Sequence, residues 1–270
     1  MAARTRLKGV AVDPNLLAHI RSLGLGFRRG SRDRRAGQKG LAVTTAKKVP
    51  RWRRPKQVAR AALPEDFPSS DAEVAFAGRS NVGKSSLLNA LSLHMCGGAL
   101  NASVSARPGE TTSVNFYSVR ADGGGAAAKA SAAKLRQKTP LLVDLPGQGF
   151  AFGTTDKVEQ WVATTETYLR SREALRAVYL LLDARHGIKP RDRELLGLLS
   201  AAAVPVSLVM TKCDLVQPRV LAKVCGLVAE EVCSSEFSDI VEDTEWPLLV
   251  SSKAGSGLDA LTASILKWGG

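Results

Sequence analysis

A glycine-rich segment carries the clearest chemical signature in this sequence. Residues 78–86 read GRSNVGKSS, which matches the pattern G-x-x-x-x-G-K-[ST], between the apolar run EVAFA and the helical stretch KSSLLNALSLH. In this context backbone N–H groups surround phosphate, Lys84 reaches the β and γ oxygens, and the Ser85 hydroxyl can bind Mg²⁺. The pattern predicts a phosphate-binding loop made of Gly78, Arg79, Ser80, Asn81, Val82, Gly83, Lys84, Ser85 and Ser86.

A second motif, DLPG at residues 144–147, follows the apolar run LLV about 60 residues beyond Lys84. An aspartate in that place can reach Mg²⁺ through water, and the glycine amide can sense a γ-phosphate. We therefore predict Asp144 as a metal ligand and Gly147 as a catalytic residue. An aspartate after a strand is also common as a turn residue. The functional interpretation of DLPG therefore depends on its position directly after an apolar strand.

Two further motifs are candidates for recognising the base of a bound nucleotide. Thr211, Lys212 and Asp214 belong to TKCD, which follows VSLVM, and Ser251, Ser252 and Lys253 form SSK after PLLV. A carboxylate at 214 can accept hydrogen bonds from the guanine ring N–H and exocyclic amine, a donor pair that adenine lacks. Ligands bind at the carboxyl ends of parallel strands, where all these motifs are expected. The sequence thus predicts guanine rather than adenine.

The segment ARPGETTSVNFY, residues 106–117, offers two threonines, Thr111 and Thr112, before an expected strand. A threonine there can close over Mg²⁺ and the γ-phosphate. The alternative is that both are β-formers next to a Pro-Gly turn.

These motifs together with LLLDARHGIKPRD and SSKAGSGL resemble the EngB family of ribosome-biogenesis GTPases, over roughly residues 65–270. The resemblance implies a Ras-like P-loop GTPase domain with GTP or GDP and Mg²⁺ as cofactors, and Thr111 as the threonine that binds the metal and the γ-phosphate. It also implies a role in assembly of the large ribosomal subunit. Turnover is expected to be slow without a ribosomal partner, because such sites supply positioning and charge rather than a covalent intermediate.

Two positions stay open. Asn81 stands where related GTPases that use potassium have an asparagine near K⁺; the alternative is a residue that only favours the loop backbone. Gln148, directly after DLPG, stands where Ras-like GTPases have a water-orienting glutamine, whereas the EngB pattern has an apolar residue. Gln148 is therefore a candidate catalytic residue that either orients water or points away.

These motifs need strands and helices to position them. Short apolar runs predict strands at Val74–Ala77, Val114–Val119, Leu141–Asp144, Ala177–Asp183, Val206–Met210 and Pro247–Val250. Helices are expected to begin near Lys84, Asp156, Pro190, Gln217 and Gly257. This alternation is typical of an α/β fold with a mainly parallel sheet and helices on both faces. The Ala/Gly/Lys-rich stretch 121–138 is expected to be a loop insertion in the domain at 65–270.

The chain has a net charge of +13, which comes from its N-terminal part: residues 1–60 contain 17 Lys and Arg against two acidic residues, Asp13 and Asp33. We predict that residues 1–64 form a basic, largely extended arm with one short helix, which Asp13 caps and Pro14 begins. The arm is expected to bind rRNA. Within it, Trp52 either stacks on a base or docks on its own domain.

Other features narrow the class of protein. The four cysteines form no CxxC pair, which argues against a disulfide framework or structural zinc, and no apolar run is long enough to span a membrane. The expected partners are large-subunit rRNA with ribosomal proteins or other assembly factors, and the chain is expected to be monomeric outside the particle. The basic, acid-poor N-terminus favours the mitochondrial matrix, with bacterial cytoplasm as the alternative. A scaffold without GTPase activity is the competing function; a GTPase of RNA-modification enzymes would need a further domain.

Overall fold

The computed structural model describes residues 7, 9–26, 52–61, 63–96, 100, 102, 113–121, 139–147, 155–242 and 245–269. Thr111, Gln148, most of the predicted insertion and the basic stretch 27–51 lie outside these residues. Their assignments therefore stay predictions.

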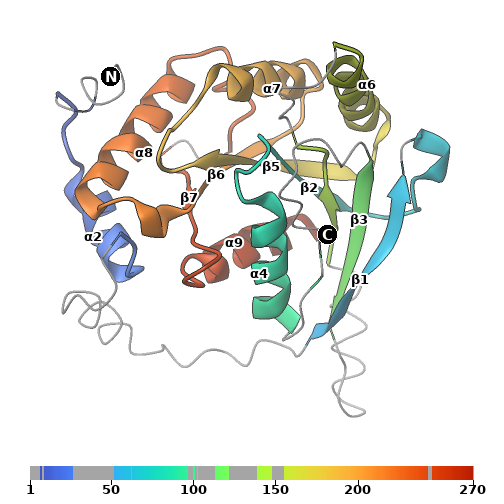
Figure 1. Ribbon diagram of the computed structural model, residues 1–270, viewed down its shortest axis with the longest axis horizontal. Helices are drawn as coiled ribbons and strands as arrows, with labels where there is room; N and C mark the ends of the chain where they lie inside the picture. Colours follow the sequence, from blue (N-terminus) through green and yellow to red (C-terminus); the bar gives the residue numbers. More distant parts are fainter. Residues whose placement is uncertain are drawn as a thin grey trace.

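Within the described residues, seven strands form one sheet in the order β1-β3-β4-β2-β5-β6-β7 (Figure 1). Strands β4, β2, β5, β6 and β7 run parallel, and β3 is antiparallel to both β4 and β1. The strands are β1 (Trp52–Ala61), β2 (Glu73–Gly78), β3 (Val114–Ala121), β4 (Leu141–Asp144), β5 (Leu175–Asp183), β6 (Val206–Thr211) and β7 (Leu248–Leu249). All six predicted strands are present, and the predicted Ras-like α/β fold is confirmed.

Helices cover both faces of this sheet (Figure 1). They are α2 (Pro14–Ser22), α4 (Lys84–Cys96), α6 (Thr155–Ser171), α7 (Pro190–Ala201), α8 (Pro218–Cys233) and α9 (Leu258–Leu266), with short 3-10 helices η1 (Pro64–Asp66), η2 (Cys213–Leu215) and η3 (Lys267–Gly269). Each predicted helix start agrees with the structure to within one residue. None of these described helices has the length and apolar character needed to cross a bilayer.

Alternate residues of the central strands point into two separate cores. Val74 and Phe76 of β2 pack with α4 and α9, whereas Ala75 and Ala77 face the core that contains residues of α6, α7 and α8. Strands buried on both faces need near-continuous apolar sequence, which is why the short apolar runs identified them.

Strand β1 was not predicted. Its sequence, WRRPKQVARA, shows no apolar alternation, but the backbone pairs antiparallel with β3 from Trp52 opposite Ala121 to Ala61 opposite Val114. An edge strand has one neighbour and tolerates proline and basic side chains. Residues 52–61, which fall in the segment predicted as an arm, therefore belong to the sheet.

The short helix predicted near the N-terminus is present as α2. The Asp13 carboxylate accepts the N–H groups of Asn15 at 2.7 Å and Leu16 at 3.1 Å, and Pro14 is the first helical residue. Its apolar side is buried: Leu16 is 1% exposed and Ile20 is fully buried. The helix therefore packs on the domain.

Candidate nucleotide-binding site

The predicted motifs meet at one edge of the sheet. Residues 78–83 follow β2, residues 144–147 include the end of β4, residues 211–214 follow from β6, and residues 251–253 lie just after β7. Because these four strands are parallel, their carboxyl ends lie at the same edge, where ligands bind in open α/β sheets.

The phosphate loop begins at a close approach between two strands. Gly78 has φ +151°, and a Cβ atom on it would lie 2.9 Å from the carbonyl oxygen of Leu181 on β5. A side chain at this position would force β2 and β5 apart. The loop then ends in α4, whose first residue is Lys84.

The DLPG motif lies directly against this loop. The Lys84 ammonium forms an ion pair with the Asp144 carboxylate, and the two side chains are 10% and 6% exposed. A Cβ on Gly147 would lie 3.5 Å from the Cα and N atoms of Ser80. The structure thus brings together the lysine, aspartate and glycine that the sequence predicted to act on the phosphates.

The TKCD motif is joined to the phosphate loop by two contacts. The Thr211 hydroxyl lies 2.7 Å from the carbonyl oxygen of Val82 and can donate a hydrogen bond to it. The Lys212 ammonium donates to the carbonyl oxygen of Asn81, and its stem passes 3.6 Å from the place of a Cβ on Gly83. These contacts set the distance between the base-recognition and phosphate-binding segments.

Asp214 is held by the third motif. The fully buried Ser251 hydroxyl donates to a carboxylate oxygen of Asp214 at 2.7 Å, and the Ala254 N–H donates to the same hydroxyl at 3.0 Å. This chain of hydrogen bonds fixes the aspartate as an acceptor. Ser252 and Lys253 follow, and Lys253 is exposed.

One residue of this site was missed by the sequence reasoning. The carboxylate of Asp183, at the end of β5, accepts hydrogen bonds from Lys212 at 3.0 Å and from Arg185 at 2.7 and 2.9 Å. Burial opposes its ionisation, but these hydrogen bonds outweigh burial and hold the pKa of Asp183 well below its ordinary value. The available signal was an aspartate ending an apolar strand beside Thr211, its partner in the sheet register.

Three further residues of the predicted phosphate loop, Arg79, Asn81 and Ser86, lie in different surroundings. The Arg79 guanidinium lies 3.2 Å from the carboxylate of Asp192, so its side chain is directed at α7. Burial raises the pKa of Asp192, although that carboxylate also accepts the Lys189 N–H at 2.9 Å. Asn81 is exposed with φ +60°, and Ser86 is exposed at the start of α4.

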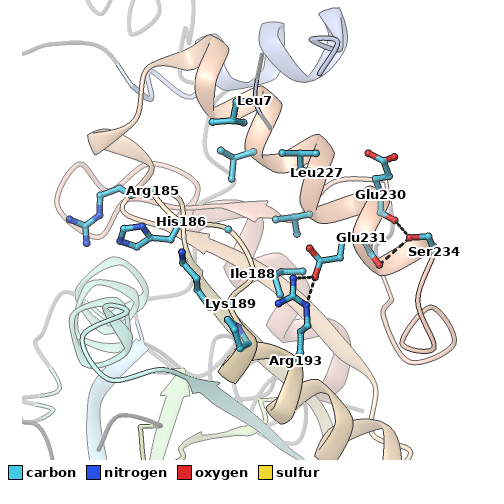
Figure 2. A pocket seen from close by; sticks show the side chains of 14 residues that line it. Leu7, Arg185, His186, Ile188, Lys189, Arg193, Leu227, Glu230, Glu231 and Ser234 are labelled. Carbon is cyan, nitrogen blue, oxygen red and sulfur yellow. Dashed lines mark hydrogen bonds and ion pairs between the residues drawn. The ribbon is translucent and has the colours of Figure 1, made fainter. Parts of the chain in front are cut away.

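A separate pocket of about 850 Å³ lies between α8 and the loop that follows β5 (Figure 2). Leu7 and Val224 give it an apolar side, while Arg185 and Arg193 contribute charge, and Arg193 is paired with Glu231. None of the predicted nucleotide-binding residues is among the described residues that line it. The pocket adjoins the site at the strand ends through Arg185, which also donates hydrogen bonds to Asp183.

Comparison with known proteins agrees with this geometry. The family model for 50S ribosome-binding GTPases matches residues 73–212. The chain is 39% identical to the probable GTP-binding protein EngB of Rhodospirillum rubrum over 206 residues, 74% of this chain and 78% of the relative. It is also 39% identical to the same-named protein of Sinorhizobium medicae, over 73% of this chain and 83% of that one.

Solved structures share the fold. A crystal structure of a probable GTP-binding protein EngB matches with a TM-score of 0.51 and 22% identity, covering 73% of this chain and 98% of that chain. The structure of Era in complex with MgGDPNP and nucleotides 1506–1542 of 16S ribosomal RNA matches with a TM-score of 0.50 and 22% identity, covering 73% and 56%.

Proposed function

Since the chain belongs to the EngB family of GTP-binding GTPases, we propose that it binds GTP across the four loops described above and hydrolyses it to GDP and phosphate. One observation carries the assignment of this site. Thr211 and Lys212 bond to the backbone of the phosphate loop at Val82 and Asn81, so base recognition and phosphate binding share one rigid frame. Such pre-organisation favours nucleotide binding because little ordering is needed when the ligand arrives.

The residues present fit a magnesium ion. Mg²⁺ prefers hard oxygen ligands, and the Ser85 hydroxyl and the Asp144 carboxylate supply them beside the phosphate loop. Asp144 pairs with Lys84 and is nearly buried, as suits a carboxylate that acts in a charged site. We propose that Ser85, Asp144 and Thr111 hold the ion, directly or through water. When bound there, Mg²⁺ would supply positive charge that offsets the negative charge developing on the phosphate oxygens.

The proposed mechanism is positioning rather than covalent chemistry. In this proposal Lys84 brings a positive charge to the transferred phosphoryl group, and the backbone N–H of Gly147 senses the γ-phosphate; the position of Gly147 next to Ser80 of the phosphate loop supports this role. Thr111 closes over the phosphate, and Gln148 either orients the attacking water or points away. Because this set contains no strong general base, we propose that turnover is slow until a partner completes the site.

Asn81 is our candidate contact for a potassium ion. Its side chain is exposed at the phosphate loop, and a K⁺ ion beside the phosphates would offset transition-state charge as an arginine finger does. GTP turnover should then be faster in KCl than in NaCl at equal ionic strength, and Asn81→Ala should remove the difference. Equal rates in the two salts for the unmodified protein would contradict this role.

We further propose that the protein assists assembly of the large ribosomal subunit and binds rRNA. Two observations support this: the matching family model is described as 50S ribosome-binding, and the N-terminal 60 residues carry 17 Lys and Arg. Era, whose fold this chain shares, was solved with a fragment of 16S rRNA. Ribosomal proteins and other assembly factors are further proposed partners.

For location we propose the mitochondrial matrix, with bacterial cytoplasm as the alternative. The basic, acid-poor N-terminus is typical of organellar targeting segments and supports this location. Because Leu16 and Ile20 are part of the core, we propose that α2 is retained in the mature protein. Subcellular fractionation followed by N-terminal sequencing tests both points.

The deciding experiment for function is GTP turnover by the purified full-length chain, with and without large-subunit assembly particles. We expect slow hydrolysis alone, faster hydrolysis with particles, and none with Lys84→Ala. Nucleotide binding without hydrolysis under every condition would instead support the alternative function, an assembly scaffold that has lost its GTPase activity.

A further inference from the structure

The N-terminal helix α2 shares a core with residues 211–216, which contain the TKCD motif and are called the guanine-recognition loop below. Leu16, Ile20 and Leu25 are at most 1% exposed, and they share a hydrophobic cluster with Leu221 and Cys225 of α8 and with Cys213 of η2. In Figure 1, α2 lies beside the beginning of α8, far from the edge strand β1. The residue after Cys213 is Asp214, so this helix packs next to the base-recognition motif.

Gly26, four residues after the end of α2, leaves no room for a side chain. Its φ is +75°, and a Cβ there would lie 2.2 Å from the carbonyl oxygen of Val216 and 2.9 Å from Cδ of Pro218. Val216 directly follows η2 as its C-cap, and Pro218 begins α8. The backbone of the N-terminal segment therefore abuts the segment that directly follows Asp214.

A second contact holds the beginning of the same segment. The Lys223 ammonium on α8 donates to the carbonyl oxygen of Leu7 at 2.8 Å, and Leu7 lies against α8 at the pocket of Figure 2. The segment from Leu7 to Gly26 is thus fixed to α8 at both of its ends. The matching family model begins only at residue 73, so this segment lies outside the part of the chain that the family model matches.

We propose that the N-terminal segment 7–26 positions the guanine-recognition loop and so contributes to the preference for guanine in cis. The inference rests on the proposed nucleotide-binding function. The Asp214 side chain is held by Ser251, and its backbone belongs to η2, which is followed directly by Val216 against Gly26. A shift of Val216 would move the carboxylate away from the guanine N–H and amine, because hydrogen bonds weaken steeply with misalignment.

Two neighbouring glycines give a matched pair of variants. Gly24 has φ +64°, and a Cβ on it would have no other atom within 4 Å, whereas Gly26 has nearly the same φ but faces Val216. Alanine at either place therefore causes similar backbone strain. Only Gly26→Ala pushes against the guanine-recognition loop.

The readout is the ratio of affinities for GDP and inosine diphosphate, which lacks the exocyclic amine that Asp214 is expected to bind. Gly26→Ala should lower GDP affinity by about tenfold and inosine diphosphate affinity less, because one hydrogen bond to a charged group is lost selectively. Gly24→Ala should leave the ratio unchanged. An unchanged ratio in Gly26→Ala, with a wild-type protein that prefers GDP, overturns the inference and leaves the proposed function intact.

A measurement on the unmodified protein covers the case in which Gly26→Ala does not fold. Because coupling between two sites is reciprocal, GDP should slow hydrogen exchange of amides in α2 more than in α6, a helix in the same core. Equal protection of the two helices contradicts the inference. Failure of the wild-type chain to bind GDP at all overturns the proposed function first, and the inference with it.

Discussion

At the residue scale, we propose that Asp214 selects the base that the site accepts. Its carboxylate accepts a hydrogen bond from Ser251 at 2.7 Å and keeps further acceptor capacity for a ligand. Asparagine at this position retains an oxygen for Ser251 but presents an amide N–H₂ to the base. Guanine would then meet a donor with its own donors, while xanthine would offer a carbonyl oxygen.

We therefore expect Asp214→Asn to weaken GDP binding by about a hundredfold and to strengthen binding of xanthosine diphosphate. Competition against a fluorescent nucleotide measures both affinities. Wild-type protein run with the same two competitors is the control, and a variant that keeps its preference for GDP would show that the base-recognition assignment is wrong.

Asp183 is a positioning residue for Lys212. Its buried carboxylate holds the lysine ammonium that also reaches the phosphate loop at Asn81. Asp183→Asn removes the charge but keeps the shape. We expect it to lower the free energy of unfolding by about 2 kcal/mol at pH 7, because hydrogen bonds to charged groups contribute about this much. It should also weaken the binding of GDP and GTP to the same extent.

The pH dependence of this effect has a definite sign. The pKa of Asp183 is lowered on folding, so its stabilisation is fully present above its ordinary pKa of 3.8 and is lost as pH falls toward the folded value. Urea unfolding of wild type and Asp183→Asn between pH 7 and pH 3 should therefore show a gap that narrows below about pH 4. A gap of constant size over that range would contradict the assignment.

At the scale of elements, what could be predicted depended on burial. Strand β5 is apolar along LRAVYLLLD because both of its faces are covered, and its sequence alone identified it. Strand β1 was not predicted because its sequence has no apolar pattern. At the edge of the sheet it needs none, since backbone pairing with β3 holds it. Its partner could be known only from the tertiary fold.

Part of the candidate site could likewise be predicted from the sequence, and part could not. Motif order and strand ends were sufficient to predict that Lys84, Asp144 and Asp214 gather at one edge of the sheet. The pairing of Asp183 with Lys212 depends on the register of β5 against β6, and the pairing of Arg79 with Asp192 depends on where α7 packs. Neither register nor helix placement can be read from local sequence.

A buried ion pair joins β2, α6 and the loop before β5. Glu73 is fully buried and accepts hydrogen bonds from Tyr168 at 2.8 Å and from Arg172, whose guanidinium also stacks over Phe67 and Phe116. Burial and the charge of Glu73 raise the pKa of Tyr168, which keeps its hydroxyl a donor. Removing the arginine would leave a carboxylate uncompensated in the core.

We expect Arg172→Ala to lower the free energy of unfolding by about 3–5 kcal/mol, the usual cost of breaking a buried pair. Arg170→Ala is the matched control: Arg170 pairs with Glu166 at 2.9 Å on the exposed side of α6, where such a pair contributes about 0.3–0.5 kcal/mol. Urea unfolding of both variants measures the difference. Equal losses of unfolding free energy in the two variants would mean that the buried Glu73 carboxylate does not need Arg172 to compensate its charge.

At the scale of the whole molecule, the excess positive charge lies in one part of the sequence. Residues 61–270 carry 21 Lys and Arg against 23 Asp and Glu, so the net charge of +13 comes from the first 60 residues. The structure fixes both sides of the most basic stretch, 27–51: Gly26 abuts Val216, and Trp52 begins β1 at one edge of the sheet. The described residues that flank this stretch are therefore held in the domain on both sides.

Anchoring changes which variant tests rRNA binding. Deleting residues 1–60 would remove α2 and most of β1 along with the charge, so a loss of binding would not be interpretable. Replacing basic residues of the stretch 27–51 with glutamine keeps both anchors. The nine positions are Arg28, Arg29, Arg32, Arg34, Arg35, Lys39, Lys47, Lys48 and Arg51.

If this stretch contacts rRNA phosphates, the replacement should weaken binding to large-subunit rRNA and flatten its salt dependence. Each lost phosphate contact reduces the slope of log K against log salt by about 0.7–0.9. GDP affinity should not change, because none of the nine replaced residues is among the predicted nucleotide-binding residues. Replacing the four basic residues of the insertion, Lys129, Lys134, Arg136 and Lys138, is the control for general loss of charge. A salt slope that falls only with the insertion variant would move the proposed rRNA contact from the N-terminal stretch to the insertion.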